Sequence, residues 1–280
     1  MRTLRKGLLA LGFSALMYAM PAVAQQKEAK LGWKLGAQAY SFNRFTLAEA
    51  LDKLDSCGLQ YVECFPGQTI GGGIEGKMDF KMDAAKQKEV LNLLKSKKKT
   101  LVAFGVVSPR TEEDWKQLFD FAKAMKIQII TSEPRPEDLD IVSKLADQYK
   151  IKVAIHDHPK PSHYWHPDSV SVAIKGRSKY LGACADIGHW VRSGLDPVEC
   201  MKMLNGRIYS MHFKDLNEKS RQAHDVIWGT GISNVEAVLH EMKAQKFKGM
   251  ISAEYEHNWY NSVPEITQSV KNVRAMIEKL

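Results

Sequence analysis

The sequence contains little cysteine, and its first half contains no histidine. Four of the 280 residues are cysteine, and all nine histidines lie at or after His156. Cys57 and Cys200 fall late in helical patterns, whereas Cys64 and Cys184 fall inside strand-like runs. This placement argues against a disulfide framework and favours buried free thiols. Chemistry that needs an imidazole is therefore confined to the second half of the chain.

The sequence also lacks an extended basic run, although its formal net charge is +8. Lys97-Lys98-Lys99 is the only tight cluster, and the other lysines are scattered along helix-like segments, as on solvated helix faces. We therefore expect neither nucleic acid nor a membrane as a partner. The sequence has no arginine cluster and no phosphate-cradling loop, since Gly229-Thr230-Gly231 is expected to shape a turn.

The N-terminus has the pattern of an export signal. Three cations, an apolar run over residues 7–20 and the small-residue pattern Ala22-Val23-Ala24 predict a secretory signal peptide over residues 1–24. The apolar run is too short for a membrane span, and no cysteine is available for a lipid anchor. Removal of the three cations would leave a formal net charge of +5. We expect a periplasmic location in a bacterium.

Short apolar runs alternate with amphipathic stretches over residues 25–280, which is typical of repeated βα units. Eight strands are predicted over residues 34–41, 60–65, 100–107, 128–133, 152–158, 182–186, 208–214 and 249–256. A helix is predicted after each strand, over residues 47–56, 84–97, 112–126, 136–149, 167–173, 197–204, 234–245 and 264–278. The fold class is therefore α/β, with a single (β/α)8 TIM barrel. The insert Gly71-Gly72-Gly73 is expected to form a loop over the barrel mouth.

Four predicted strands in the second half end in residues that commonly bind metals. These residues are His156, Asp186, His212 and Glu254. Active sites of TIM barrels lie at the carboxyl ends of the strands, so the four side chains are expected to converge on one divalent metal ion. His158 shares a face with His156 and is an alternative ligand. Two nitrogens and two carboxylate oxygens favour Mn, Co, Zn or Fe over Mg or Ca.

The ligand residues belong to longer motifs. These are Asp186-x-x-His189, His212-Phe213-Lys214-Asp215, Glu254 on the last strand and Gly229-Thr230-Gly231. With these motifs the chain resembles the xylose-isomerase-like barrels, also called the sugar phosphate isomerase/epimerase superfamily, over nearly all of residues 25–280. The resemblance implies a metal held by a fifth-strand Glu, an Asp, a His and the last Glu. This sequence departs from that pattern, because its fifth strand offers His156 in place of the Glu.

Residues near the expected ligands are candidates for proton transfer and substrate binding. His158 is the expected base. Glu133 and Glu63 end two further strands and compete for this role, although either could instead orient other groups. Substrate contacts are expected from His189, Glu63, Trp190 and Glu256.

Lys214 has two alternative roles. It could supply positive charge at a substrate oxygen, or it could form a salt bridge with Asp215 or Glu256. Aromatic side chains near the predicted mouth could stack on a sugar or an aglycone, and each is as well explained by packing. They are Trp165, Trp190, Trp228, Trp259 and Tyr260.

The missing carboxylate bears on the reaction. Epimerases of the resembled family use two metal-bound carboxylates on opposite faces of the sugar, whereas this chain keeps only Glu254. Metal-assisted enolisation with one base remains. An exported enzyme is expected to act on unphosphorylated sugars, and the chain also resembles barrels that cleave 3-keto-glycosides by β-elimination. We therefore expect a metal-dependent lyase for 3-keto-glucosides, paired with an oxidoreductase that makes the ketone.

The sequence leaves three alternatives open. The first is a sugar isomerase or epimerase that acts on unphosphorylated monosaccharides. The second is a secreted sugar-binding protein without catalysis, which the retained ligand set disfavours. The third comes from DNA-repair endonucleases that share this barrel and take zinc-binding histidines from early strands. The absence of histidine before His156 disfavours that third function.

Overall fold

A computed structural model describes residues 26–280 of the chain. The predicted signal peptide over residues 1–24 lies outside these residues. Among residues 26–280, no helix has the length and apolar character that a membrane crossing requires.

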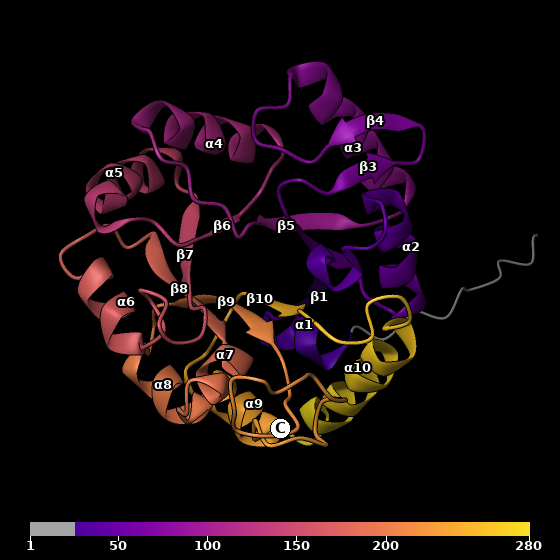
Figure 1. The fold of residues 1–280 in the computed structure, drawn as a ribbon, viewed down its shortest axis with the longest axis vertical. Helices are drawn as coiled ribbons and strands as arrows, with labels where there is room; N and C mark the ends of the chain where they lie inside the picture. Colours follow the sequence, from indigo (N-terminus) through magenta and orange to yellow (C-terminus); the bar gives the residue numbers. More distant parts are fainter. Residues whose placement is uncertain (1–25) are drawn as a thin grey trace, which may run out of the picture.

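Parallel strands form the centre of the molecule (Figure 1). In the described part of the chain, eight strands close into a barrel in the order β1-β10-β9-β8-β7-β6-β5-β2. Their bounds are β1 Lys34–Gln38, β2 Tyr61–Cys64, β5 Thr100–Phe104, β6 Ile129–Ser132, β7 Lys152–His156, β8 Leu181–Asp186, β9 Ile208–Phe213 and β10 Met250–Ala253. The predicted TIM barrel is confirmed. Most predicted strands extend too far at the carboxyl end, because the residues there leave the sheet to line the mouth.

A ring of helices surrounds the barrel (Figure 1). The helices that follow the strands are α2 Leu47–Ser56, α3 Ala84–Ser96, α4 Glu112–Ala124, α5 Leu139–Tyr149, α6 Pro167–Ile174, α8 Pro197–Met203, α9 Val235–Ala244 and α10 Val263–Ile277. Side chains fix several starting points, as where Thr46 and Glu49 form a capping box before α2. The sequence patterns missed the short helices α1 (Lys27–Leu31) and α7 (Ile187–Arg192), because five or six residues are too few for a periodic signal.

The glycine-rich insert forms a hairpin of β3 (Thr69–Gly71) and β4 (Ile74–Lys77). The hairpin packs against the outer helices: a Cβ atom at Gly71 would contact Thr46, and one at Gly72 would contact Ala48 and Leu93. The expectation of a loop over the mouth is therefore wrong. Because Gly71 has no side chain, this segment can pack closely against Thr46 at the start of α2.

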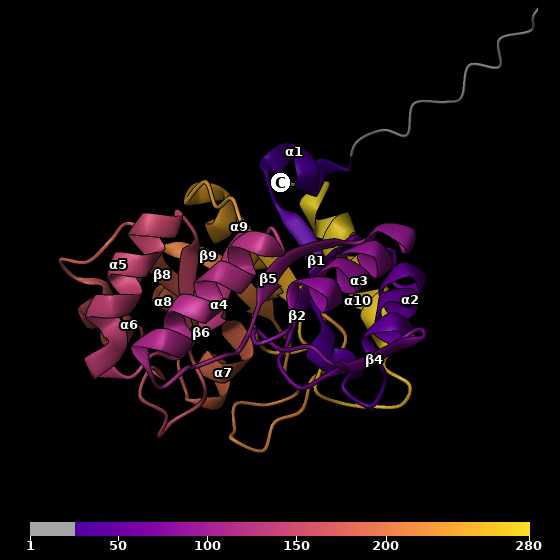
Figure 2. The ribbon, with the colours of Figure 1, turned by 90° about the horizontal axis from the view of Figure 1, so that it is seen from above.

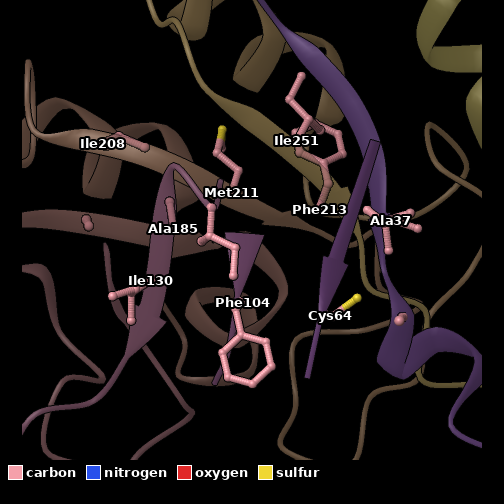
Figure 3. Packing of buried hydrophobic residues seen from close by; sticks show 14 of the residues in the cluster. Ala37, Cys64, Phe104, Ile130, Ala185, Ile208, Met211, Phe213 and Ile251 are labelled. Carbon is pink, nitrogen blue, oxygen red and sulfur yellow. The ribbon is translucent and has the colours of Figure 1, made fainter. Parts of the chain in front are cut away.

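Alternate side chains along the strands point to opposite faces, so the barrel has two separate hydrophobic cores. Outward side chains such as Met211, Phe213 and Ile251 pack against the helices (Figure 3). A smaller apolar cluster that includes Ala154 and Met250 belongs to the opposite strand face and fills the barrel interior. All four cysteines are buried free thiols, as predicted. The mouth end of the barrel interior is lined by polar side chains instead, which are the residue types that an active site requires.

Gly36 provides a test of the close contact between β1 and β2. A Cβ atom at Gly36 would lie 2.2 Å from the carbonyl oxygen of Tyr61, so the backbone would have to shift. We expect Gly36→Ala to lower the free energy of unfolding by about 3 kcal/mol in urea denaturation. Gly67→Ala is the control, because a Cβ atom there has no neighbour within 4 Å and only the positive φ is strained. The control should cost about 1 kcal/mol. Equal losses in the two variants would contradict the assigned packing.

Candidate metal centre and active site

A cavity of about 270 Å³ opens at the carboxyl ends of the strands, and we call it the mouth cavity. Its lining residues are Gln38, Tyr40, Phe65, Pro66, Gly105, Val106, His158, His189, Glu254 and Glu256. A larger hollow of about 620 Å³ is lined by the start of β1 and by α1, at the other end of the barrel, and contains none of the predicted site residues. The chemistry-bearing side chains therefore gather at the mouth cavity.

Four buried side chains meet beside the mouth cavity. They are His156 at the end of β7, Asp186 at the end of β8, His212 on β9 and Glu254 after β10. One ligand atom from each lies within 4.8 Å of the other three. We call these four residues the metal centre. The structure thus brings together the predicted ligand set.

Unpaired polar atoms test whether the metal centre suits a cation. Within residues 26–280, four buried atoms of the centre lack a hydrogen bond of good geometry, although the Lys214 ammonium forms ion pairs with the two carboxylate oxygens among them. They are Nε2 of His156, Oδ2 of Asp186, Nδ1 of His212 and Oε2 of Glu254. Buried polar atoms without partners are costly, and a divalent cation would satisfy all four at once. The residues therefore fit a divalent metal ion.

Outer carboxylates orient the two imidazoles of the metal centre. Nδ1 of His156 lies 3.1 Å from Glu133, and Nε2 of His212 lies 3.1 Å from Glu63. A ring N–H that donates to a carboxylate leaves the lone pair of the other ring nitrogen directed at the metal centre. In the neutral form, both ligand histidines are therefore oriented with the free ring nitrogen toward the metal centre.

Glu63 is an orienting residue and not a substrate contact. Its carboxylate is fully buried and also accepts hydrogen bonds from Thr131 and Ser252. It does not line the mouth cavity. The expectation that Glu63 binds substrate is therefore wrong, because three side chains that point into the barrel hold this carboxylate instead: His212, Thr131 and Ser252.

The ionisation of the surrounding groups follows from these contacts. Burial would lower the pKa of His156, but the nearby carboxylate of Asp186 and the hydrogen bond to Glu133 raise it to about 9. Burial would raise the pKa of Glu133, but hydrogen bonds from His156 and His158 lower it to about 2. The metal centre therefore attracts positive charge, and Glu133 remains an anion that orients its partners and is too weak a base for proton abstraction.

Lys214 lies against the carboxylates of the metal centre. Its Nζ is 3.0 Å from Asp186 and 2.8 Å from Glu254. It also forms a 2.8 Å salt bridge with Glu256. Of the two salt bridges considered from the sequence, the structure contains the one to Glu256. The ammonium group thus lies among three carboxylates, beside the mouth cavity.

Asp215 does not form the salt bridge with Lys214 that was considered from the sequence. It binds the backbone of the following loop. Its two carboxylate oxygens accept hydrogen bonds from the backbone N–H groups of Leu216, Gly229, Gly231 and Ser233. A Cβ atom at Gly231 would lie 2.4 Å from Asp215, so glycine is required for this approach. The Gly229-Thr230-Gly231 segment therefore shapes a turn, as predicted, and fixes the loop over residues 216–234.

His158 and His189 present imidazoles to the mouth cavity. Nδ1 of His158 bonds to Glu133, and its side chain is 49% exposed. A proton on Nδ1 leaves Nε2 with a free lone pair, which is the arrangement of a base oriented by a carboxylate. His189 stacks on His158 with ring centroids 5.2 Å apart. The two rings form one wall of the mouth cavity.

Trp190 and Trp228 do not lie at the mouth. Their side chains are 1% and 2% exposed and belong to the hydrophobic core between the barrel and its helices. The expectation that Trp190 binds substrate is therefore wrong. Trp190 follows His189 on α7, and a helical turn directs consecutive side chains to different faces. Because the sequence patterns missed α7, they could not separate these two residues.

Sequence reasoning also missed Arg192 and Gln38. Arg192 lies on α7 and contacts both Glu256 at 3.3 Å and Nδ1 of His189 at 3.1 Å, so it holds two residues of the mouth cavity in place. No sequence signal marked it, since α7 was not expected. Gln38 ends β1 on the inward face and could have been found by the same strand-end argument as His156.

The choice between His156 and His158 as ligand can be tested by metal content. We expect His156→Gln to weaken metal binding by about 100-fold or more, because one of four ligands is lost. His158→Gln is the matched control and should retain about one ion per chain, since His158 is not one of the four residues of the metal centre and belongs only to the overlapping group Glu133, His156 and His158. Elemental analysis and metal titration of both purified variants measure the difference. The reverse pattern would overturn the ligand assignment.

Comparisons with known proteins agree with this geometry. The xylose isomerase-like TIM barrel family matches residues 51–279. An uncharacterized protein from Parabacteroides distasonis is 36% identical, with a TM-score of 0.72 over 89% of this chain and 99% of that one. No curated protein matches the chain.

More distant solved structures share the fold. A D-tagatose 3-epimerase-like protein is 17% identical, with a TM-score of 0.67 over 88% of this chain and 97% of that one. A xylose isomerase-like TIM barrel protein from Mycobacterium smegmatis in complex with magnesium is 12% identical, with a TM-score of 0.69 over 88% and 97%. By the extent of its family match, the chain belongs to the xylose isomerase-like TIM barrel family.

Proposed function

We propose that this protein is a periplasmic, metal-dependent lyase that cleaves 3-keto-glucosides by β-elimination across C1 and C2. Membership of a family of mostly sugar isomerases and epimerases, together with the metal centre, supports a sugar-modifying enzyme. The predicted export signal over residues 1–24 supports the location and an unphosphorylated substrate. An oxidoreductase that makes the 3-keto group would supply the substrate.

The main support for this proposal is the position of a single oriented imidazole beside the metal centre. The fifth strand contributes His156 where a two-carboxylate epimerase would need a carboxylate. Beside it, His158 faces the mouth cavity and is oriented by the ionised Glu133. A β-elimination needs one base on one face of the sugar, which matches one oriented imidazole.

The residues suggest the following sequence of bond changes. A divalent ion on the metal centre would supply positive charge that acidifies the proton next to the ketone. Nε2 of His158 takes the proton from C2, and the electron pair forms the enolate of C2 and C3. The enolate then returns its electrons, so that a C1=C2 double bond forms and the bond from C1 to the aglycone oxygen breaks. The protonated His158 returns its proton to the leaving oxygen. Lys214 adds positive charge while the enolate exists.

An aromatic wall faces the polar side of the mouth cavity. Tyr40 and Phe65 line the cavity and contact each other edge to face at 5.1 Å. Trp259 extends this wall, with its ring centroid 5.8 Å from that of Tyr40. Of the aromatic residues considered from the sequence, Trp259 therefore adjoins a residue that lines the cavity. Flat apolar surface of this kind suits a sugar ring or an aglycone.

A second candidate function is a sugar isomerase or epimerase. Glu256 also lines the mouth cavity, where Lys214 and Arg192 hold its carboxylate. A carboxylate and an imidazole on one cavity could exchange protons on two faces of a substrate. This observation favours interconversion of free sugars over cleavage of a glycoside.

Substrate trials separate the two functions. We expect the metal-loaded protein to release aglycone from 3-keto-glucosides and to form the C1=C2 product, detected by NMR. His158→Gln should lower kcat about 10²- to 10⁴-fold while retaining its metal, because only the base is lost. His166→Gln is the matched control, since His166 caps α6 and does not line the mouth cavity. Intact glycosides together with interconverted ketoses and aldoses would refute the lyase and support the isomerase.

A further inference from the structure

The amino ends of the strands form a second concave site, at the end of the barrel opposite to the metal centre. Figure 2 shows α1 and the C-terminus at this end of the barrel and α7 at the other end. A pocket of about 260 Å³ opens there, which we call the floor pocket. Its charged lining residues are Lys34, Lys150, Lys152 and Lys248. No aspartate or glutamate lines it.

Two of these lysines point toward the barrel axis from opposite sides. Lys34 shares a strand face with Gln38, which lines the mouth cavity, and Lys152 shares a face with His156. Their strands, β1 and β7, are four places apart in the closed order of eight strands and so stand across the barrel from each other. The closed barrel therefore directs two ammonium groups at the same point.

The positive charge of the floor pocket is poorly balanced. Among residues 26–280, no carboxylate lies within 4.0 Å of the ammonium groups of Lys34, Lys152 or Lys248, and Lys150 has only a loose contact of 3.8 Å with Asp147. Burial, and then the charge of Lys34, lower the pKa of Lys152. The ring of Tyr209 lies 4.6 Å from the Lys152 ammonium and offers only a weak substitute for an anion.

Backbone conformation also distinguishes the lysines at this end. Lys98, Lys126, Lys150 and Lys246 follow α3, α4, α5 and α9, each with φ between 53° and 59°. This left-handed region favours glycine, and a side chain there costs about 1 kcal/mol. Attraction to the helix carboxyl ends offsets part of the cost. Of these four, Lys150 lines the floor pocket, which thus carries a cationic side chain at a position where glycine would be less strained.

We propose that the floor pocket binds a phosphate-type oxyanion. Several ammonium groups that converge without a counter-charge attract a multivalent anion more strongly than a monovalent one. A concave pocket of this size admits a single phosphate group. The phosphate could be free in solution or could belong to a lipid head group, since both present the same oxygens. This site is separate from the proposed lyase site, so either can fail alone.

Thermal unfolding of the full chain tests the floor pocket. At low ionic strength, inorganic phosphate should raise Tm by about 3–5 °C more than sodium chloride of equal ionic strength, because bound anion stabilises the folded state. The Lys34→Gln/Lys152→Gln variant should lose this difference. Without phosphate its Tm should not fall below that of the unchanged protein, because the repulsion between the two lysines is gone. Lys88→Gln/Lys219→Gln removes the same charge from exposed positions elsewhere and should keep the phosphate effect.

Two outcomes would overturn the proposal. One is an equal rise of Tm in chloride and phosphate, which means general screening only. The other is an unchanged phosphate effect in Lys34→Gln/Lys152→Gln. If that variant does not fold, calorimetry of Lys248→Gln replaces it, with phosphate affinity expected to fall about tenfold; an unchanged affinity would count against the site.

Vesicles separate the two sources of phosphate. The protein is sedimented with phosphatidylcholine vesicles that contain or lack phosphatidic acid. Sedimentation that requires phosphatidic acid and Lys34 supports a lipid head group. Binding of inorganic phosphate without sedimentation supports a free anion. Absence of both would refute the floor pocket as an anion site.

Discussion

A buried carboxylate inside the barrel is the constraint on which the site depends. Glu63 on β2 accepts hydrogen bonds from β6, β9 and β10 through Thr131, His212 and Ser252. A carboxylate without solvent contact is tolerated only when donors surround it, so these strands must keep their register. The same contacts direct the free nitrogen of His212 at the metal centre. Contacts among four strands of the barrel and the orientation of one metal ligand therefore meet at one buried carboxylate.

Much of the fold followed from the sequence because its periodicity is strong. Runs of four to eight apolar residues followed by amphipathic segments predict βα units, and strand ends predict where ligands such as Asp186 lie. Short elements gave no such signal. The helix α7 has six residues, and without it Trp190 could not be distinguished from His189. The role of Glu63 depends on partners 68, 149 and 189 residues away, which no local pattern contains.

The lysines also show a spatial arrangement that local sequence patterns do not predict. In the sequence they are dispersed, and dispersed lysines predict a solvated surface. Closing the barrel brings the first residues of distant strands to one end, so that Lys34 and Lys152 share a pocket despite their separation along the chain. Surface charge is thus a property of the topology as much as of the composition.

Glu133 accepts hydrogen bonds from both His156 and His158. One oxygen therefore serves a ligand of the metal centre and the base of the proposed reaction. A change in the position of this carboxylate would therefore move both rings at once. The geometry of the metal centre and the orientation of His158 then depend on one shared acceptor. A substitution at Glu133 could not disturb the base without also disturbing a metal ligand.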